Sequence, residues 1–199
     1  MEYLFKASIV TAIFYACYKL FLQRETFFQS NRWFLLSGLI FSILLPFIVI
    51  PIYVEQNPIN NVMLVTADQI SNTVSEESFD YITLLPLVYS LGVAIFMTKM
   101  IIELSSLYRL LNGQKVINSG AIKYIETTED VPPFSFFNYI IYNSNSFNAS
   151  ELELIVNHEK VHVRQWHSLD IILVQLAAVF FWFNPFIWLY KKDLQQNLE

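Results

Sequence analysis

Two histidines and a glutamate, close together in the last quarter of the chain, are the residues best suited to chemistry. His158, Glu159 and His162 stand in the order His-Glu-Lys-Val-His. On a helix, residues four apart lie one above the other on the same face, so two imidazoles can bind one zinc ion. Glu159 would lie about 100° round the helix, close enough to take a proton from a zinc-bound water. The spacing therefore predicts a zinc-peptidase helix with Glu159 as general base.

The third zinc ligand must come from elsewhere, because a catalytic site usually has three protein ligands and one open position. The chain has three histidines, all between His158 and His167. His167 lies five residues after His162, off the ligand face, so we expect a polar residue or the neighbour of a ligand rather than a ligand. The third ligand should then be a carboxylate. The downstream candidates are Asp170, Asp193 and Glu199.

Asp170 has two roles open to it. Ser168 could cap a new helix with Asp170 in its first turn, which is the favoured interpretation. Alternatively, Asp170 could orient a ligand histidine from behind.

Composition places this helix in a membrane protein. The chain is 55% hydrophobic and 15% charged, with a mean hydropathy of +0.43, whereas a soluble domain is usually about a quarter charged. Three apolar runs, 3–22, 33–54 and 81–103, are long enough to span a bilayer as helices. The formal net charge is -5 and no basic cluster occurs, which argues against nucleic acid as a direct partner. The single cysteine, Cys17, excludes an intrachain disulfide.

The links between the runs predict an orientation. Lys19, Arg24 and Arg32 flank the first link, whereas the second link, 55–80, carries five acidic residues and no Lys or Arg. Positive charge stays in the cytoplasm. We therefore expect a membrane domain over 1–104 with its N-terminus outside, and a cytoplasmic peptidase-like domain over 105–199.

The segment after the third run has a mixed pattern. Short β-prone runs at 114–118 and 121–127 surround Ser119-Gly120, which is a hairpin signal. A further strand is predicted at 136–142, where a substrate backbone could add to the sheet edge. Ser150, followed by acidic residues, predicts the start of the metal helix over 150–166. The expected fold class is mainly α: three transmembrane helices plus a small α+β zincin-like cytoplasmic domain.

A fourth apolar run, 169–190, is not expected to cross the membrane. Lys191-Lys192 follow it directly, and Asn184-Pro185 interrupts it. We expect a bent pair of helices, 169–183 and 185–198, packed at the inner membrane surface and bringing Glu199 back to the histidines. The alternative is a true fourth span, with Glu199 playing no part.

From Asn157 to Glu199 the chain resembles the BlaR/MecR-type antirepressor membrane metallopeptidases. The matching motifs are HEKVHVRQWHSLD, FWFNPFIWLY and QNLE, with RETFFQSNRWFLL and PFSFF earlier in the chain. The resemblance implies zinc on His158, His162 and Glu199, with Glu159 as general base. It also implies a bacterial cytoplasmic membrane, with the active site on the cytoplasmic side.

The function implied by the resemblance is regulatory. A membrane zinc endopeptidase of this kind would cleave a cytoplasmic protein, such as a transcriptional repressor, or itself, and a homodimer is one assembly open to it. The alternatives are a housekeeping protease for misfolded membrane proteins and a non-catalytic transducer that keeps the peptidase fold. The family's helix continues past the third ligand, so we expect a chain truncated after Glu199. The 26-residue outer link is too short for a sensor domain.

Overall fold

The computed structural model contains three long apolar helices, and it describes residues 2–25, 27–48, 84–112, 114, 116–129 and 131–198. Helix α1 (Glu2–Cys17) continues as a π-helical turn (Tyr18–Leu22), and α2 (Phe28–Leu44) ends in a 3-10 turn (Leu45–Phe47). Helix α3 spans Leu85–Asn112. Among the described residues these are the three helices long and apolar enough to cross a membrane, as predicted. The end of the second predicted run and the start of the third lie outside the described residues.

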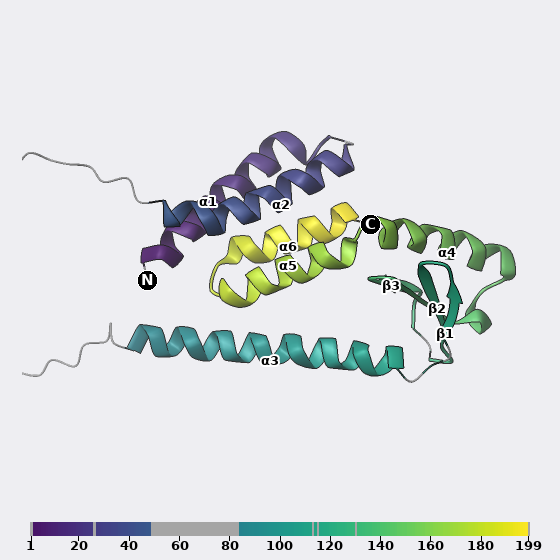
Figure 1. Cartoon of the computed structure of the whole chain (residues 1–199). Coiled ribbons are helices and arrows are strands. Elements are labelled where there is room, and N and C mark those ends of the chain that lie inside the picture. The colour runs from purple at the N-terminus through teal and green to yellow at the C-terminus, as the bar shows by residue number, and fades with distance from the viewer. Residues whose placement is uncertain are drawn as a thin grey trace, which may run out of the picture.

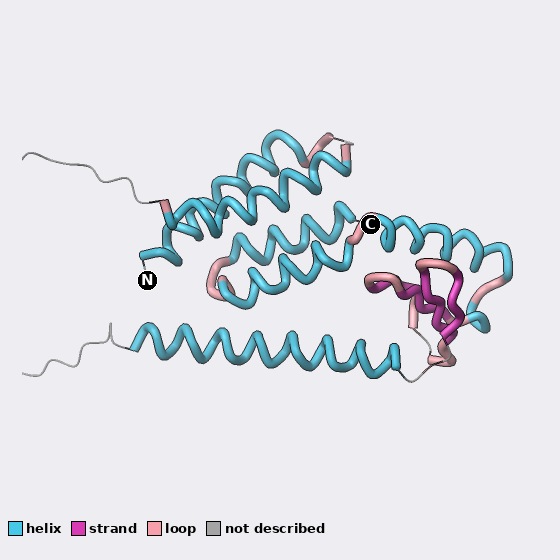
Figure 2. Tube along the Cα trace, in the orientation of Figure 1, coloured by secondary structure: helices cyan, strands magenta, loops and turns pink. Residues whose placement is uncertain are grey.

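A small four-stranded sheet follows α3 and lies beside the metal helix (Figure 2). Its strands are β1 (Val116–Ser119), β2 (Ile122–Glu126), β3 (Phe134–Phe136) and β4 (Tyr139–Tyr142), in the order β1-β2-β4-β3. Strands β2 and β4 are parallel and the other pairs antiparallel. The single strand predicted over 136–142 is present as the end of β3 and the whole of β4, so only its continuity is wrong. Phe137 adopts a left-handed backbone with φ 50°, so the chain turns there and makes β3 the edge strand.

Helix α4 (Ala149–Arg164) carries the metal motif. Its cap is Asn148, whose side chain accepts from the backbone of Glu151 while the Glu151 carboxylate accepts from the Asn148 N–H. This reciprocal capping box satisfies two backbone donors at the helix start. The prediction that Ser150 starts the helix is therefore wrong by two residues: Asn148 is an equally good cap, and both residues have an acid three positions later.

Helices α5 (His167–Phe180) and α6 (Pro185–Leu198) form an antiparallel hairpin. The Asn184 side chain accepts from the N–H of Phe186 and so caps α6, while Pro185 fills the first helical position. Figure 1 shows the hairpin lying between the α1–α2 pair and α3. The pair thus runs alongside the three long apolar helices, while its position at the inner membrane surface stays a prediction.

The hairpin packs between these helices because its buried side chains complete a core shared with the first two helices. Tyr190 of α6 is fully buried, and its hydroxyl donates to the backbone oxygen of Leu35 in α2. At the tip, Trp182 stacks on Phe96 of α3. The core gathers the following residues from four helices and the π-helical turn: Ala7, Tyr15, Tyr18, Leu35, Leu36, Leu39, Val174, Ala177, Ala178, Phe181, Ile187, Tyr190, Leu194 and Leu198.

Candidate metal centre

Helix α4 presents the three motif residues together, as predicted. One ligand atom from each of His158, Glu159 and His162 lies within 4.8 Å of the others. The Nε2 atoms of the two histidines approach to 2.9 Å. In a tetrahedral zinc site, with Zn–N bonds of about 2.0–2.1 Å, two such nitrogens are roughly 3.3 Å apart. The two converging Nε2 atoms therefore fit the needs of a zinc ion, because a small ring rotation supplies the remaining separation.

His167 lies directly against His162, although it is five residues further along the chain. Its Nδ1 is 2.6 Å from the Nδ1 of His162, and its Nε2 is 2.9 Å from Oε1 of Gln165. This contact arises because α4 ends before Gln165 and Trp166 takes a left-handed backbone, φ 59°, that turns the chain back. Burial, then the neighbouring His162 and Arg32, lowers the pKa of His167 to about 4. His167 is thus neutral at pH 7, and its Nδ1 can accept a hydrogen bond from the Nδ1–H of His162.

The cap predicted at Ser168 is wrong, although Asp170 does lie in the first turn of α5. The residue before α5 is Trp166, which makes no side-chain cap, and the Ser168 hydroxyl accepts instead from the N–H of Phe137 in the sheet. Asp170 is 3% exposed and accepts from Nε of Arg32 in α2 at 2.6 Å. The Asp170 carboxylate is thus paired with a buried cation of another helix.

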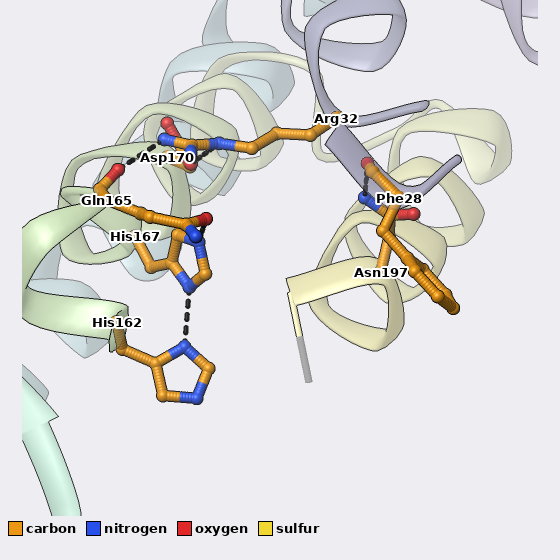
Figure 3. Close-up of polar contacts among 7 residues, drawn as sticks. All are labelled: Phe28, Arg32, His162, Gln165, His167, Asp170 and Asn197. Atoms are coloured by element: carbon orange, nitrogen blue, oxygen red, sulfur yellow. Dashed lines mark hydrogen bonds and ion pairs between the residues drawn. The ribbon is translucent and has the colours of Figure 1, made fainter. Parts of the chain in front are cut away.

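Arg32 is the residue that sequence reasoning missed. The charge pattern indicates only that Arg32 belongs to the positive flank of the first link, yet the residue is 8% exposed. Its Nε donates to Asp170, and its Nη2 donates to the backbone oxygen of Gln165 at 2.6 Å (Figure 3). The sequence does contain one indication of this role. Arg32 and Asp170 are charged residues at the start of two apolar runs, and a charge in such a place requires a partner of opposite charge.

A cavity of about 540 Å³ opens over the motif. Edge strand β3 contributes Phe134 and Ser135, and the end of α6 contributes residues up to Leu198. Of the carboxylate candidates, Asp193 faces Lys19 of the π-helical turn, 3.3 Å away. Glu199 lies outside the described residues, directly after a residue that lines the cavity.

Comparison with known proteins points the same way. Residues 137–199, which are 63 of the 199 residues, match the family model described as BlaR1 peptidase M56. The matched segment begins at the turn before β4 and contains α4, α5 and α6. No curated protein matches the chain. Over the segment that carries the metal helix, the chain is therefore similar to the BlaR1 peptidase M56 family.

Proposed function

We propose that this chain is a membrane-embedded zinc metallopeptidase. His158 and His162 hold the metal, Glu199 completes the ligand set, and Glu159 is the general base. The observation that carries the proposal is the convergence of two Nε2 atoms and a carboxylate inside a cavity. The family match over the same residues supports it.

When bound, zinc would supply a Lewis acid that polarises the scissile carbonyl and acidifies water. The residues of this chain do the rest. Glu159 is 9% exposed and lines the cavity, so its carboxylate can take a proton from water there and deliver it to the leaving amine. With metal on Nε2 of His162, the Nδ1–H of that ring donates to Nδ1 of His167. His167 then carries its proton on Nε2 and donates it to Oε1 of Gln165.

The peptide substrate would bind in an extended form. Edge strand β3 has one neighbour, β4, and its residues Phe134 and Ser135 line the cavity. An extended chain can add to a free strand edge through backbone hydrogen bonds. The substrate we propose is a cytoplasmic protein of the repressor type, or the chain itself.

We propose that the cavity faces the cytoplasm. The basic link with Lys19 and Arg24 lies at the same end of the helices as α4 and the sheet (Figure 1). A single cysteine placed in 143–149, in a background where Cys17 is replaced by Ser, should stay unlabelled by an impermeant thiol reagent on intact cells. One placed in 57–79 should react. The reverse labelling would put the metal centre outside.

The catalytic assignment is tested on the full chain in lipid nanodiscs. Elemental analysis should find about one zinc per chain, and replacing both His158 and His162 by Ala should remove it. Glu159→Gln should keep the zinc while cleavage of β-casein, and of the chain itself, falls about a hundredfold or more. Cleavage by Glu159→Gln at the parent rate would exclude Glu159 as the base. A parent protein that keeps zinc but cleaves neither probe would favour the non-catalytic transducer.

A further inference from the structure

Two residues one turn apart at the start of α2, Phe28 and Arg32, make three hydrogen bonds to the segments that carry the proposed metal ligands. Arg32 contacts the corner between α4 and α5, through the Gln165 carbonyl and the Asp170 carboxylate, each at 2.6 Å. Near the other end of the same turn, the backbone oxygen of Phe28 accepts from Nδ2 of Asn197 at 2.9 Å. Figure 3 shows these contacts around one space. That space is a cavity of about 240 Å³ which also has His158 and His162 in its wall.

The Arg32 guanidinium suits this corner for electrostatic reasons. The carbonyls at the end of α4 lack helical partners and carry partial negative charge. The Asp170 carboxylate adds a full negative charge, and the side chains of Arg32 and Asp170 are only 10% and 5% exposed. A planar guanidinium can donate to both acceptors at once, whereas a lysine ammonium is a single point charge. Arg32 therefore fixes the end of α4 relative to the start of α5.

Continuous polar contacts run from this corner to the metal motif. Gln165 accepts from Arg32 through its backbone and contacts His167 through its side chain. His167 in turn contacts the ring of His162 on the side opposite its metal-facing Nε2. Since the partner of the second ring nitrogen fixes the orientation of a ligand histidine, a shift of the corner changes how His162 points.

We propose that Arg32 is a positioning residue of the metal centre, and that the first turn of α2 is a bracket that holds both ligand-bearing segments. This rests on the proposed function, because the bracket serves a metal held by His162. Helix α2 is then part of the metal centre's support as well as a membrane anchor. Displacement of α2 along its axis would change metal affinity without touching a ligand.

The experiment compares zinc affinity in three variants of the full chain in nanodiscs, by competition with a chelator. In Arg32→Met with Asp170→Leu, both charges are removed together, so no unpaired charge stays buried and the fold should survive. Zinc affinity should fall about 10–100-fold. Arg32→Lys keeps the charge but cannot serve both acceptors, and should lose affinity in the same direction. Tyr89→Phe removes a hydrogen bond to Phe180 at the far end of α5 and should bind zinc as the parent does.

A second readout does not need the metal. In the metal-free parent labelled with ¹⁵N-histidine, His167 should show a neutral ring protonated on Nε2, and this signal should become a mixture of tautomers in both Arg32 variants. If the parent binds no zinc, the proposed function fails, while the ring signals still decide the bracket. Ring signals and zinc affinity within about twofold of the parent in both Arg32 variants would overturn the proposal. An equal loss in Tyr89→Phe would also overturn it, because the effect would then be general loosening.

Discussion

Gly92 of α3 lies where that helix passes the tip of the hairpin, and adding one methyl group there should force the two apart. A Cβ on Gly92 would be 2.2 Å from Cε2 of Trp182 and 2.5 Å from its Cζ2 and Nε1. Carbon atoms pack at about 3.5 Å, so Trp182 or α3 must move by roughly 1.3 Å. The Trp182 ring is stacked on Phe96, with centroids 6.1 Å apart, and cannot simply swing away. We expect Gly92→Ala to cost about 1–3 kcal/mol of unfolding free energy.

The assay is unfolding of the full chain by denaturing detergent in mixed micelles, followed by circular dichroism. Ser90→Ala, at an exposed position two residues away, is the matched control and should cost less than about 0.5 kcal/mol. Trp182→Leu removes the three atoms that the new methyl would meet. In that background Gly92→Ala should cost little, which gives a double-mutant cycle with a large coupling energy. The reasoning is refuted if Gly92→Ala is neutral, or if it costs the same with and without Trp182.

Two further predictions concern the metal helix and its neighbour. The pKa of His167 is lowered to about 4, against about 6.5 in an unfolded chain, so the unfolded state binds more protons between these values. The metal-free protein should therefore lose stability as pH falls from about 6.5 to 4, by up to about 3 kcal/mol; His167→Gln should flatten this part of the profile, and parallel profiles would contradict the assignment. Asn148→Ala should cost about 1 kcal/mol by removing the cap of α4. Ser150→Ala should be nearly neutral, and a larger loss at Ser150 would contradict the observed cap.

The sequence predicts features that depend on local rules. The metal helix follows from the spacing of His158 and His162, and the break between α5 and α6 follows from Pro185, which lacks a backbone donor. Local rules do not predict contacts between distant residues. Arg32 and Asp170 are 138 residues apart, and the sequence around one does not indicate that the other is its partner. The packing of the hairpin between the other helices cannot be predicted from local rules either. An apolar face shows that a helix is buried but does not show against which partner.

The turn at Phe137 and the cap at Asn148 are two local features that the sequence patterns do not predict. A left-handed backbone is rare for phenylalanine, so no sequence pattern predicts an interruption of the strand there. The structure supports this turn from outside, because the Ser168 hydroxyl accepts from the N–H of Phe137. At the start of α4, Asn148 and Ser150 are both good caps. Each also has an acid three residues later, Glu151 and Glu153, so the capping-box pattern does not choose between them.

The core shared by α1, α2, α5 and α6 has a consequence for the order in which the protein is made. The first two helices are synthesised well over a hundred residues before the hairpin. Until the hairpin arrives, the side chains of α1 and α2 that later meet it, such as Leu35, lack these partners and, in the proposed membrane arrangement, would face lipid. The histidines of α4 also emerge before α6, which forms part of the cavity wall. We therefore expect the nascent protein to be an inserted but inactive precursor, in which the late docking of one hairpin both closes the core and completes the metal centre.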